Sequence, residues 1–390
     1  MNKIEFFKHN CTEEDILLAN QVMRSTFLTT GPMVSKFERK FSKYLKITET
    51  VGLNSCTGAI HLALLRYGIE PGDEVITTPM NFVATANAIL QAGAIPIFVD
   101  ICPKSGLLLH DAVEASINSK TKAIIPVHLY GRMVDMHNFS KLSLKYNLVL
   151  IEDAAHCIEG IRDGVRPGQL SHAACFSFYT TKSMTCGEGG AIACRSSKDA
   201  LWYRSARHHG ISKSASYRYF KGFQHWDMET MGWKYNMSDI QAAILINQID
   251  RLGINRQRRQ DLEMFYRSLF EDINGLDFME KPGENEINAH HLFTVLLPKN
   301  VSRDEVVKKL QENGIGCAVN YRAIHTLTYF REKFGYKPED FPIAYEIGSR
   351  TITFPLYPKL TEDEIVIIHR TFKKILYQLS RSSPSPLFGI

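Results

Sequence analysis

Residues 122–156 read KAIIPVHLYGRMVDMHNFSKLSLKYNLVLIEDAAH, and their pattern decides the fold class. Two short apolar runs, KAIIPV and LVLIEDAA, flank residues 136–146, whose apolar side chains recur at helical spacing. Upstream, the runs EVITTP (74–79) and IPIFVD (95–100) enclose a helical pattern over 84–91 in the same way. Strands that alternate with helices of about 10–15 residues indicate βαβ units. The sequence therefore predicts an α/β protein with a mainly parallel sheet sandwiched by helices.

The segments on either side of this region follow other patterns. Helices are expected over 15–24 and 34–44, and one long helix over 238–267 begins at a Ser/Asp N-cap signal. A smaller α+β unit follows, with its expected elements being the strands HLFTVLL (291–297) and CAVNY (317–321) and the helices 303–313 and 361–379. We place a domain boundary near residue 250. This gives a large α/β domain over 1–250, with an N-terminal helical preamble, and a small C-terminal α+β domain over 251–390. The tail RSSPSPLFGI is expected to be frayed.

Composition narrows the class of protein. Of 390 residues, 44% are apolar and 22% are charged, which is typical of a globular protein with an ordinary core. The net charge is +5 with scattered cations, so neither nucleic acid nor a membrane is an expected partner. No run is apolar enough to span a membrane, and the N-terminus lacks the apolar core of a signal peptide. The eight cysteines stand singly without a CxxC pair, so we expect free thiols, no metal site and a cytoplasmic protein.

The segment FSFYTTKSMTCGEGG (176–190) places Lys182 between an apolar strand and a glycine-rich turn. A lysine at a strand exit is often a solvated surface group. Here residues 173–179 are apolar enough to be buried, so Lys182 is expected at the edge of the sheet where α/β proteins bind ligands. A desolvated lysine amine has a lowered pKa and forms Schiff bases with carbonyls and with pyridoxal phosphate (PLP). Lys182 is therefore a candidate catalytic residue.

Further polar residues follow predicted strands. Asp153 comes directly after an apolar run, and Asn81, Phe82 and His128 hold corresponding positions. The Asp153 carboxylate fits a strand-end cap or a metal ligand. Beneath a pyridine ring it would instead keep the ring nitrogen protonated through an ion pair. His156 fits a bond to Asp153, a bond to the phenolate of such a cofactor, or the start of a helix.

A candidate phosphate site lies in NSCTGAIHLALL (54–65), where Ser55, Thr57 and Gly58 lead into an apolar helix. The free N–H groups and the dipole of a helix N-terminus favour an anion, although alone this segment fits an ordinary N-cap better. Phe82, in a polar loop, fits either the core or a ring stacked on a planar cofactor. No GxGxxG, Walker A, GxSxG or HExxH motif occurs, which disfavours dinucleotide, P-loop, α/β-hydrolase and zinc-protease chemistry.

In combination, these segments resemble the sugar aminotransferases of PLP fold type I, the DegT/DnrJ/StrS-type family. The resemblance covers almost the whole chain, and its segments stand in the family's order. They are TFLTTGPMVSKFERKFSKYL, NSCTGAIHLAL, GDEVITTPMNFVATANAI, PVHLYG, LIEDAAH, SFYTTKSMTCGEGG, WKYNMSDIQAAI and IGCAVNYRAIH. The resemblance implies a PLP-dependent aminotransferase with a large domain and a smaller C-terminal domain.

The resemblance also implies a role for each matching residue around the cofactor. Lys182 would bind PLP as a Schiff base and shuttle a proton, Asp153 would pair with the pyridinium nitrogen, and His156 would lie near the phenolate. The other implied contacts to PLP are a stacked ring from Phe82 and phosphate contacts from Thr57, Gly58, Ser177 and, across a homodimer with shared active sites, Asn236 of the partner subunit.

The resemblance also implies residues that contact the nucleotide sugar, and the chain departs from the family at several positions. Tyr321, Arg322 and His325 would line the nucleotide-sugar side, although NYRAIH also fits a simple strand-to-loop transition. The chain departs from the family's usual residues in loops around the predicted site, at Cys56, Gly58, Ser183, Met184 and Cys186. Some relatives are dehydratases with histidine at the lysine position, and Lys182 argues against that activity.

The subgroup is indicated by KYNMSDI, by the aromatic-rich stretch YRYFKGFQHWDMETMGW (217–233) and by YRAIHTLTYF. They most resemble enzymes that aminate the 4-keto group of UDP-linked sugars, of the 4-amino-arabinose type. The expected reaction transfers an amino group, with L-glutamate as the family's usual donor, to a nucleotide-linked keto-deoxy sugar in lipopolysaccharide or other polysaccharide biosynthesis. The alternatives are amination at carbon 3 of a dTDP-keto sugar or of a keto-cyclitol, and a catalytically silent relative that acts as a regulator.

Overall fold

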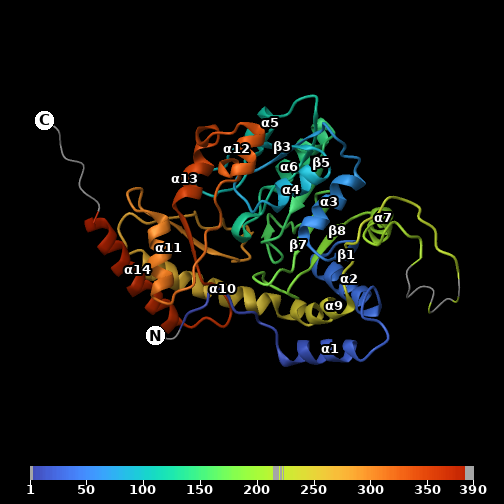
Figure 1. Ribbon diagram of the computed structural model, residues 1–390, viewed down its shortest axis with the longest axis horizontal. Coiled ribbons are helices and arrows are strands. Elements are labelled where there is room, and N and C mark those ends of the chain that lie inside the picture. The colour runs from blue at the N-terminus through green and yellow to red at the C-terminus, as the bar shows by residue number, and fades with distance from the viewer. Residues whose placement is uncertain (1–2, 214–218, 220–221, 223, 383–390) are drawn as a thin grey trace.

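The computed structural model describes residues 3–213, 219, 222 and 224–382 (Figure 1). The aromatic-rich stretch 217–233 and the tail 381–390 lie partly outside these residues. Within the described part, no helix combines the length and the apolar character that crossing a membrane requires.

The centre of the protein is a seven-stranded sheet in the order β1-β8-β7-β5-β4-β2-β3. Strands β7, β5, β4, β2 and β3 pair in parallel, while β8 is antiparallel to both of its neighbours. The strands are β1 (Glu49–Leu53), β2 (Glu74–Thr77), β3 (Ile95–Phe98), β4 (Thr121–Ile124), β5 (Val149–Asp153), β7 (Ala173–Ser177) and β8 (Gly190–Cys194). The predicted mainly parallel sheet is confirmed.

Helices cover both faces of this sheet, because successive side chains of a strand point to opposite sides. Cys175 and Ile192 face one apolar core, which they share with helices α3, α4 and α7. Ala174 and Phe176 face a second core, shared with α2 and α9. The helices of this region are α1 (Glu13–Met23), α2 (Pro32–Leu45), α3 (Cys56–Arg66), α4 (Ala84–Gln91), α5 (His110–Ala115), α6 (Met136–Tyr146), α7 (Ser197–Ala206) and α9 (Asp239–Ile246). The α/β sandwich predicted from the sequence is therefore confirmed.

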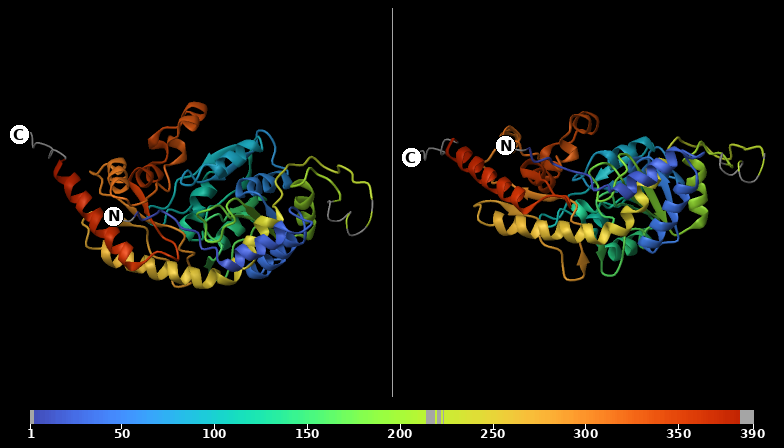
Figure 2. Two further views of the ribbon diagram at one scale, coloured as in Figure 1. Left: turned by 60° about the horizontal axis from the view of Figure 1, so that its bottom comes forward. Right: turned by 90° about the horizontal axis from the view of Figure 1, so that it is seen from below.

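The long helix expected over 238–267 is in fact two helices, α9 and α10 (Gln248–Phe270), which meet at Asn247. Helix α10 runs from the sheet to a further core, distinct from the two that flank the sheet, where Leu262, Tyr266 and Phe270 pack (Figures 1 and 2). That core is built on an antiparallel sheet in the order β12-β11-β9. The remaining elements are β6 (Ile161–Arg162), β9 (Asp277–Phe278), β10 (Glu286–Ile287), β11 (Phe293–Leu296), β12 (Thr351–Phe354), α11 (Arg303–Glu312), α12 (Thr328–Phe334), α13 (Pro342–Arg350), α14 (Glu362–Ser382) and the 3-10 turns 129–131, 324–326 and 338–340.

The C-terminal part differs from the sequence expectation at residues 317–321. Residues 317–321 were expected as a strand, but only Ala318 pairs, in an isolated bridge with Thr353. The backbone leaves the sheet after this bridge because Tyr321 is directed to a side-chain contact with His156. The proposed domain boundary near residue 250 falls in the first turn of α10 and stays a prediction.

Gly190 marks the place where β8 passes the start of α3. A Cβ atom there would lie 2.3 Å from the carbonyl carbon of Ser55 and 2.6 Å from the amide nitrogen of Cys56, both backbone atoms. We expect Gly190→Ala to lower the free energy of unfolding by about 1–3 kcal/mol, because two backbone segments must move apart. Denaturant titration measures this change. Gly253→Ala in α10, where a Cβ meets nothing within 4 Å, is the control and should be no less stable than the natural chain. Equal stability of both variants would contradict this close approach.

Candidate active site

A cavity of about 520 Å³ lies beyond the carboxyl ends of the central parallel strands. Its walls come from the start of α3, the loop after β2, the ends of β5 and β7, and residues 320–321. Among the residues predicted from the sequence, those that line it are Thr57, Phe82, Asp153, His156, Ser177, Lys182 and Tyr321. The fold therefore brings together segments that are far apart in the chain, at the edge of the sheet where α/β proteins bind ligands.

Lys182 lies on the turn between β7 and β8, where its backbone N–H donates to the Tyr179 carbonyl at 2.9 Å. Burial lowers the pKa of its amine from 10.5 to about 8, while the Asp153 carboxylate and the Cys56 thiol act in the opposite direction. An appreciable fraction of the amine is therefore neutral, and so nucleophilic, near neutral pH.

The lowered pKa predicts how the reactivity of Lys182 changes with pH. An amine reacts when it is neutral, so acylation of Lys182 should rise with pH to a midpoint near 8, below the ordinary value of 10.5. Competitive labelling with acetic anhydride, followed by peptide mass analysis, measures this profile, with the exposed Lys281 as the internal reference. In Asp153→Asn the midpoint should fall further, because that carboxylate raises the lysine's pKa. A midpoint above 10 would contradict the prediction.

Asp153, the last residue of β5, presents a buried carboxylate to the cavity. Its Oδ2 accepts hydrogen bonds from Asn81 Nδ2 at 3.0 Å and from the Thr85 hydroxyl, and its Oδ1 accepts from the Ala155 N–H at 3.1 Å. These three donors hold the carboxylate in one orientation. Within the described residues, no group of three or more His, Cys, Asp or Glu side chains is arranged to hold a metal ion.

His156 forms its hydrogen bonds with tyrosines rather than with Asp153. Its Nδ1 accepts the Tyr130 backbone N–H at 3.3 Å, so the proton of the neutral ring is on Nε2, which lies 2.9 Å from the Tyr321 hydroxyl oxygen. Burial and the nearby Lys182 lower the pKa of His156 well below its usual value, which keeps this ring neutral. The ring also lies against His291, with centroids 4.6 Å apart and the ring planes tilted by 39°. The Tyr321 hydroxyl oxygen therefore accepts a hydrogen bond from His156 Nε2, and its own O–H can donate to a group in the cavity.

The start of α3 forms the far end of the cavity. Ser55 is the N-cap, and its Oγ accepts the Gly58 N–H at 3.0 Å, so this part of the segment is an ordinary cap. Thr57 and Ser177 line the cavity, whereas Gly58 does not. The first N–H groups of a helix have no partner within it, and with the hydroxyls of Thr57 and Ser177 they offer donors to an anion.

Three further predicted residues do not line the cavity. Asn236 donates from Nδ2 to the hydroxyls of Thr29 and Thr30, at 2.9 and 3.0 Å. Arg322 is exposed, and His325 is fully buried with its ring against Phe341. Their functional assignments stay predictions.

Some residues at the site were not predicted as site residues. Asn81 and Thr85 hold Asp153, and Asn81 was recognisable only as a polar residue at a strand exit. Cys56, next to Thr57, also lines the cavity. His128 holds a similar strand-exit position, but its Nε2 lies 2.7 Å from the buried Glu152 carboxylate.

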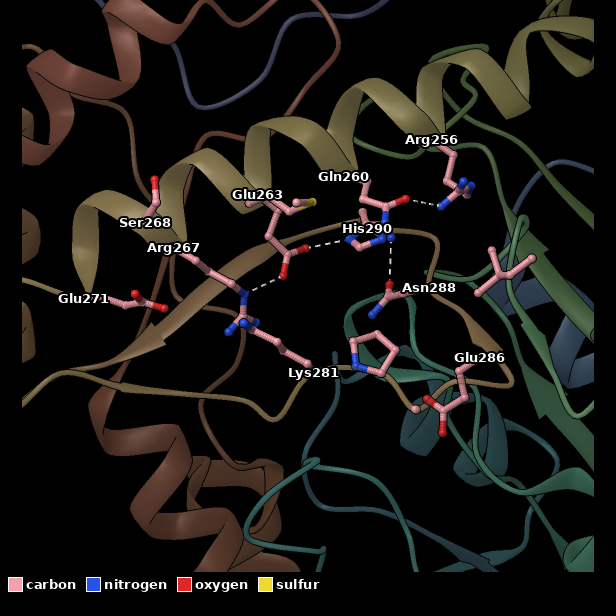
Figure 3. Close-up of a pocket in the computed structure, with 14 residues that line it drawn as sticks. Arg256, Gln260, Glu263, Arg267, Ser268, Glu271, Lys281, Glu286, Asn288 and His290 are labelled. Atoms are coloured by element: carbon pink, nitrogen blue, oxygen red, sulfur yellow. Dashed lines mark hydrogen bonds and ion pairs between the residues drawn. The ribbon is translucent and has the colours of Figure 1, made fainter.

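Another hollow, of about 620 Å³, lies along α10 (Figure 3). Three of the charged side chains in it bind one another: Glu263 accepts from Arg267 at 3.0 Å and pairs with His290 at 2.7 Å (Figure 3). None of the predicted site residues lines it. We therefore place the candidate active site at Lys182.

The side chains of the Lys182 cavity fit PLP. A lysine amine with a lowered pKa can bond the aldehyde, the fixed carboxylate of Asp153 suits the pyridinium nitrogen, and a helix N-terminus suits the phosphate. Phe82 lines the cavity with 57% of its surface exposed, so a ring face is available for stacking. Fold and site together define a PLP-dependent aminotransferase of fold type I.

The comparison with known proteins gives the family. Residues 9–373 match the model of the DegT/DnrJ/EryC1/StrS aminotransferase family, and the chain belongs to this family. It is 36% identical to the spore coat polysaccharide biosynthesis protein SpsC of Bacillus subtilis, over 90% of this chain and 92% of SpsC. The PMP form of Spr1654 from Streptococcus pneumoniae superposes with a TM-score of 0.89 at 29% identity, covering 96% of this chain and 100% of that one. PseC of Helicobacter pylori, an aminotransferase involved in pseudoaminic acid biosynthesis, gives 0.89 at 25%, with 97% and 100% covered. The predicted family and its PLP dependence are confirmed.

Proposed function

We propose that this chain transfers an amino group from L-glutamate to the 4-keto group of a UDP-linked keto-deoxy sugar, for polysaccharide or lipopolysaccharide biosynthesis in the cytoplasm. The observation that carries the aminotransferase chemistry is the single cavity shared by Lys182, with its lowered pKa, and the fixed carboxylate of Asp153. Names of relatives support the sugar, since SpsC is a polysaccharide biosynthesis protein and PseC acts in pseudoaminic acid biosynthesis. The 4-keto position and the UDP group rest on the resemblance of residues 217–240 and 321–330.

Binding follows from the placement of the donors around the cavity. Thr57, Ser177 and the start of α3 would hold the phosphate, Phe82 would cover the ring, and Asp153 would pair with the ring nitrogen. When bound, PLP supplies a protonated ring that withdraws electrons from the amino-bearing carbon. Because Asn81, Thr85 and Ala155 fix Asp153, its negative charge needs no rearrangement during the reaction.

Proton transfer falls to Lys182, whose amine can be neutral or charged near pH 8 and therefore both accepts and gives a proton. The Tyr321 hydroxyl, fixed by His156 Nε2, keeps its own proton available to an oxygen of the substrate or of the cofactor. Because His156 is neutral with its proton on Nε2, it fixes the direction of its hydrogen bond to Tyr321. This makes His156 a positioning residue in our proposal.

The substrate can be tested with the enzyme in its pyridoxamine form. We expect a UDP-linked 4-keto sugar to restore the absorbance of the PLP form fastest in a panel of nucleotide keto-sugars and keto-cyclitols. A faster response to a dTDP-linked 3-keto sugar, or to a keto-cyclitol, would replace the proposed substrate. A protein that binds no PLP and responds to no member of the panel would instead be the silent relative.

A homodimer with shared active sites is the second part of the proposal. Asn236 bonds to the loop of Thr29 and Thr30, and it pairs through its backbone with Leu53, close to the start of α3. Apolar side chains in the neighbouring segments are exposed, with Leu28 at 48% and Met231 at 63%. Such exposure around a polar residue near a phosphate site suits contact with a second copy of the chain.

Subunit mixing tests the sharing. Asn236→Asp replaces the Nδ2 donor by an oxygen that can accept from the threonine hydroxyls, and it places a negative charge beside the partner's phosphate. This variant and Lys182→Ala should therefore both be nearly inactive. In a mixed dimer the two lesions fall in one site and leave the other intact. Random reassociation makes about half of the dimers mixed, so about a quarter of all sites should recover. If mass analysis confirms mixing and activity stays at the sum of the two variants, Asn236 does not act across the dimer.

A further inference from the structure

The side chain of Gln248 forms hydrogen bonds with the backbone of the turn that carries Lys182. Gln248 is the first residue of α10 and is 4% exposed. Its Oε1 accepts the Thr185 N–H at 3.0 Å, and its Nε2 donates to the Thr185 carbonyl at 2.7 Å. Nε2 also donates to the Ile244 carbonyl of α9, at 2.8 Å. One acceptor and two donors are thus all engaged, which only an amide can supply at this position.

Thr185 in turn closes the loop around Lys182. Its hydroxyl donates to the Phe178 carbonyl at 3.1 Å and accepts the Gly187 N–H at 3.0 Å. Lys182 lies between these two ends, with its own N–H bonded to Tyr179. The hydrogen bonds between Gln248 and Thr185 therefore fix both ends of the turn relative to the junction of α9 and α10.

We propose that Gln248 is a positioning residue that sets the place of the Lys182 amine in the cavity, an inference that rests on the proposed role of Lys182. Gln248 bonds the turn at Thr185, three residues beyond Lys182, and does not line the main cavity. It fixes the backbone from which the lysine side chain extends. Its loss leaves the Thr185 N–H and two carbonyls without buried partners, so the turn gains alternative conformations.

Gln248→Leu tests the inference, with Gln260→Leu as the matched control on the same helix, where the amide bonds Arg256 and not the turn. We expect the Thr185 amide to exchange with deuterium about tenfold faster in the unliganded Gln248→Leu protein, because it loses its buried acceptor. Acylation of Lys182, and its labelling by PLP and borohydride, should change rate by about tenfold, and Gln260→Leu should match the natural chain in every assay.

Gln248→Glu adds a readout that a general loss of packing does not give. The ionised carboxylate has no hydrogen for the carbonyls of Thr185 and Ile244, whereas the neutral acid donates to one of them and still accepts from Thr185. The other titratable or charged groups nearby are Cys11, whose Sγ lies 3.9 Å from Nε2, and those that line a small cavity beside Gln248: Lys8, Lys182, Arg259, His291 and Tyr357. Relative to the natural chain at the same pH, exchange at Thr185 should therefore slow in this variant as the pH falls.

The outcomes separate this inference from the proposed function. Unchanged Lys182 acylation in Gln248→Leu, or a Thr185 exchange rate equal to that of the natural chain, overturns the role of Gln248. Should Gln248→Leu fail to fold, Gln248→Glu provides the test. If the ratio of its Thr185 exchange rate to that of the natural chain does not change with pH, the proposed role of Gln248 is overturned. Failure of PLP and borohydride to label Lys182 in the natural chain refutes the proposed function instead. In that case, deuterium exchange at Thr185 and acylation of Lys182 still test whether Gln248 positions the turn.

Discussion

Lys182→Ala should abolish amino transfer, with kcat lower by about 10⁴-fold or more. General acid–base catalysis by one positioned side chain contributes about 10²–10⁴-fold, and the covalent bond to the cofactor is lost as well. Borohydride reduction of the natural enzyme with PLP, followed by peptide mapping, should place the label on Lys182, and the variant should carry none there. Label on any other lysine in the natural enzyme would refute the assignment.

The stability of the unliganded variant separates chemistry from folding. The pKa of Lys182 is lowered to about 8 because burial disfavours its charge, so below pH 8 the folded protein carries a penalty that alanine removes. Between about pH 8 and 10.5 the unfolded chain binds more protons at this residue, so the natural chain gains stability with rising pH relative to Lys182→Ala. Denaturant titrations at pH 7 and 10 measure the difference. A variant markedly less stable than the natural chain at pH 7 would make its inactivity a folding defect.

The sequence predicted the elements that have a strong local pattern. The helices 84–91 and 136–146 have the predicted ends, and β2, β3 and β5 lie within the expected apolar runs, while β4 begins one residue before its run, at Thr121. Hydrophobic periodicity is a local property, so these elements can be predicted without knowledge of the packing. The strand expected over 317–321 is absent because a distant partner, His156, determines the conformation of Tyr321.

The same distinction explains which parts of the site were predicted. Asp153 ends β5, Lys182 lies in the turn after β7, and Thr57 is in the first turn of α3, positions that a sequence pattern reveals. Asn81, Thr85 and Tyr130 act through hydrogen bonds to residues 26 to 72 positions away, and no local pattern encodes such pairs. The break between α9 and α10 at Asn247 was missed for the same reason, since the Gln248 side chain next to it bonds Thr185, 63 positions away.

Asp153→Asn should reduce the rate of amino transfer by about 10²–10³-fold or more, measured in single-turnover experiments with PLP bound. The substitution keeps the shape of the side chain but removes the charge that pairs with the ring nitrogen, so the electron-withdrawing form of the cofactor is no longer favoured. Near-normal single-turnover rates in this variant would refute the proposed role of Asp153.

The surroundings of Asp153 provide the control for this variant. Asn81, Thr85 and Ala155 all donate hydrogen bonds to the Asp153 carboxylate. In Asp153→Asn, the NH₂ group of the new amide must face at least one of these donors. We therefore expect the variant to lose about 1–3 kcal/mol of stability. Thr85→Ala removes one of these donors but keeps the negative charge, so it should cost comparable stability and much less rate. If Thr85→Ala slows transfer as much as Asp153→Asn does, the orientation of the carboxylate, rather than its charge, limits the reaction. A rate loss confined to Asp153→Asn, at matched stability, assigns the effect to the charge that faces the cofactor.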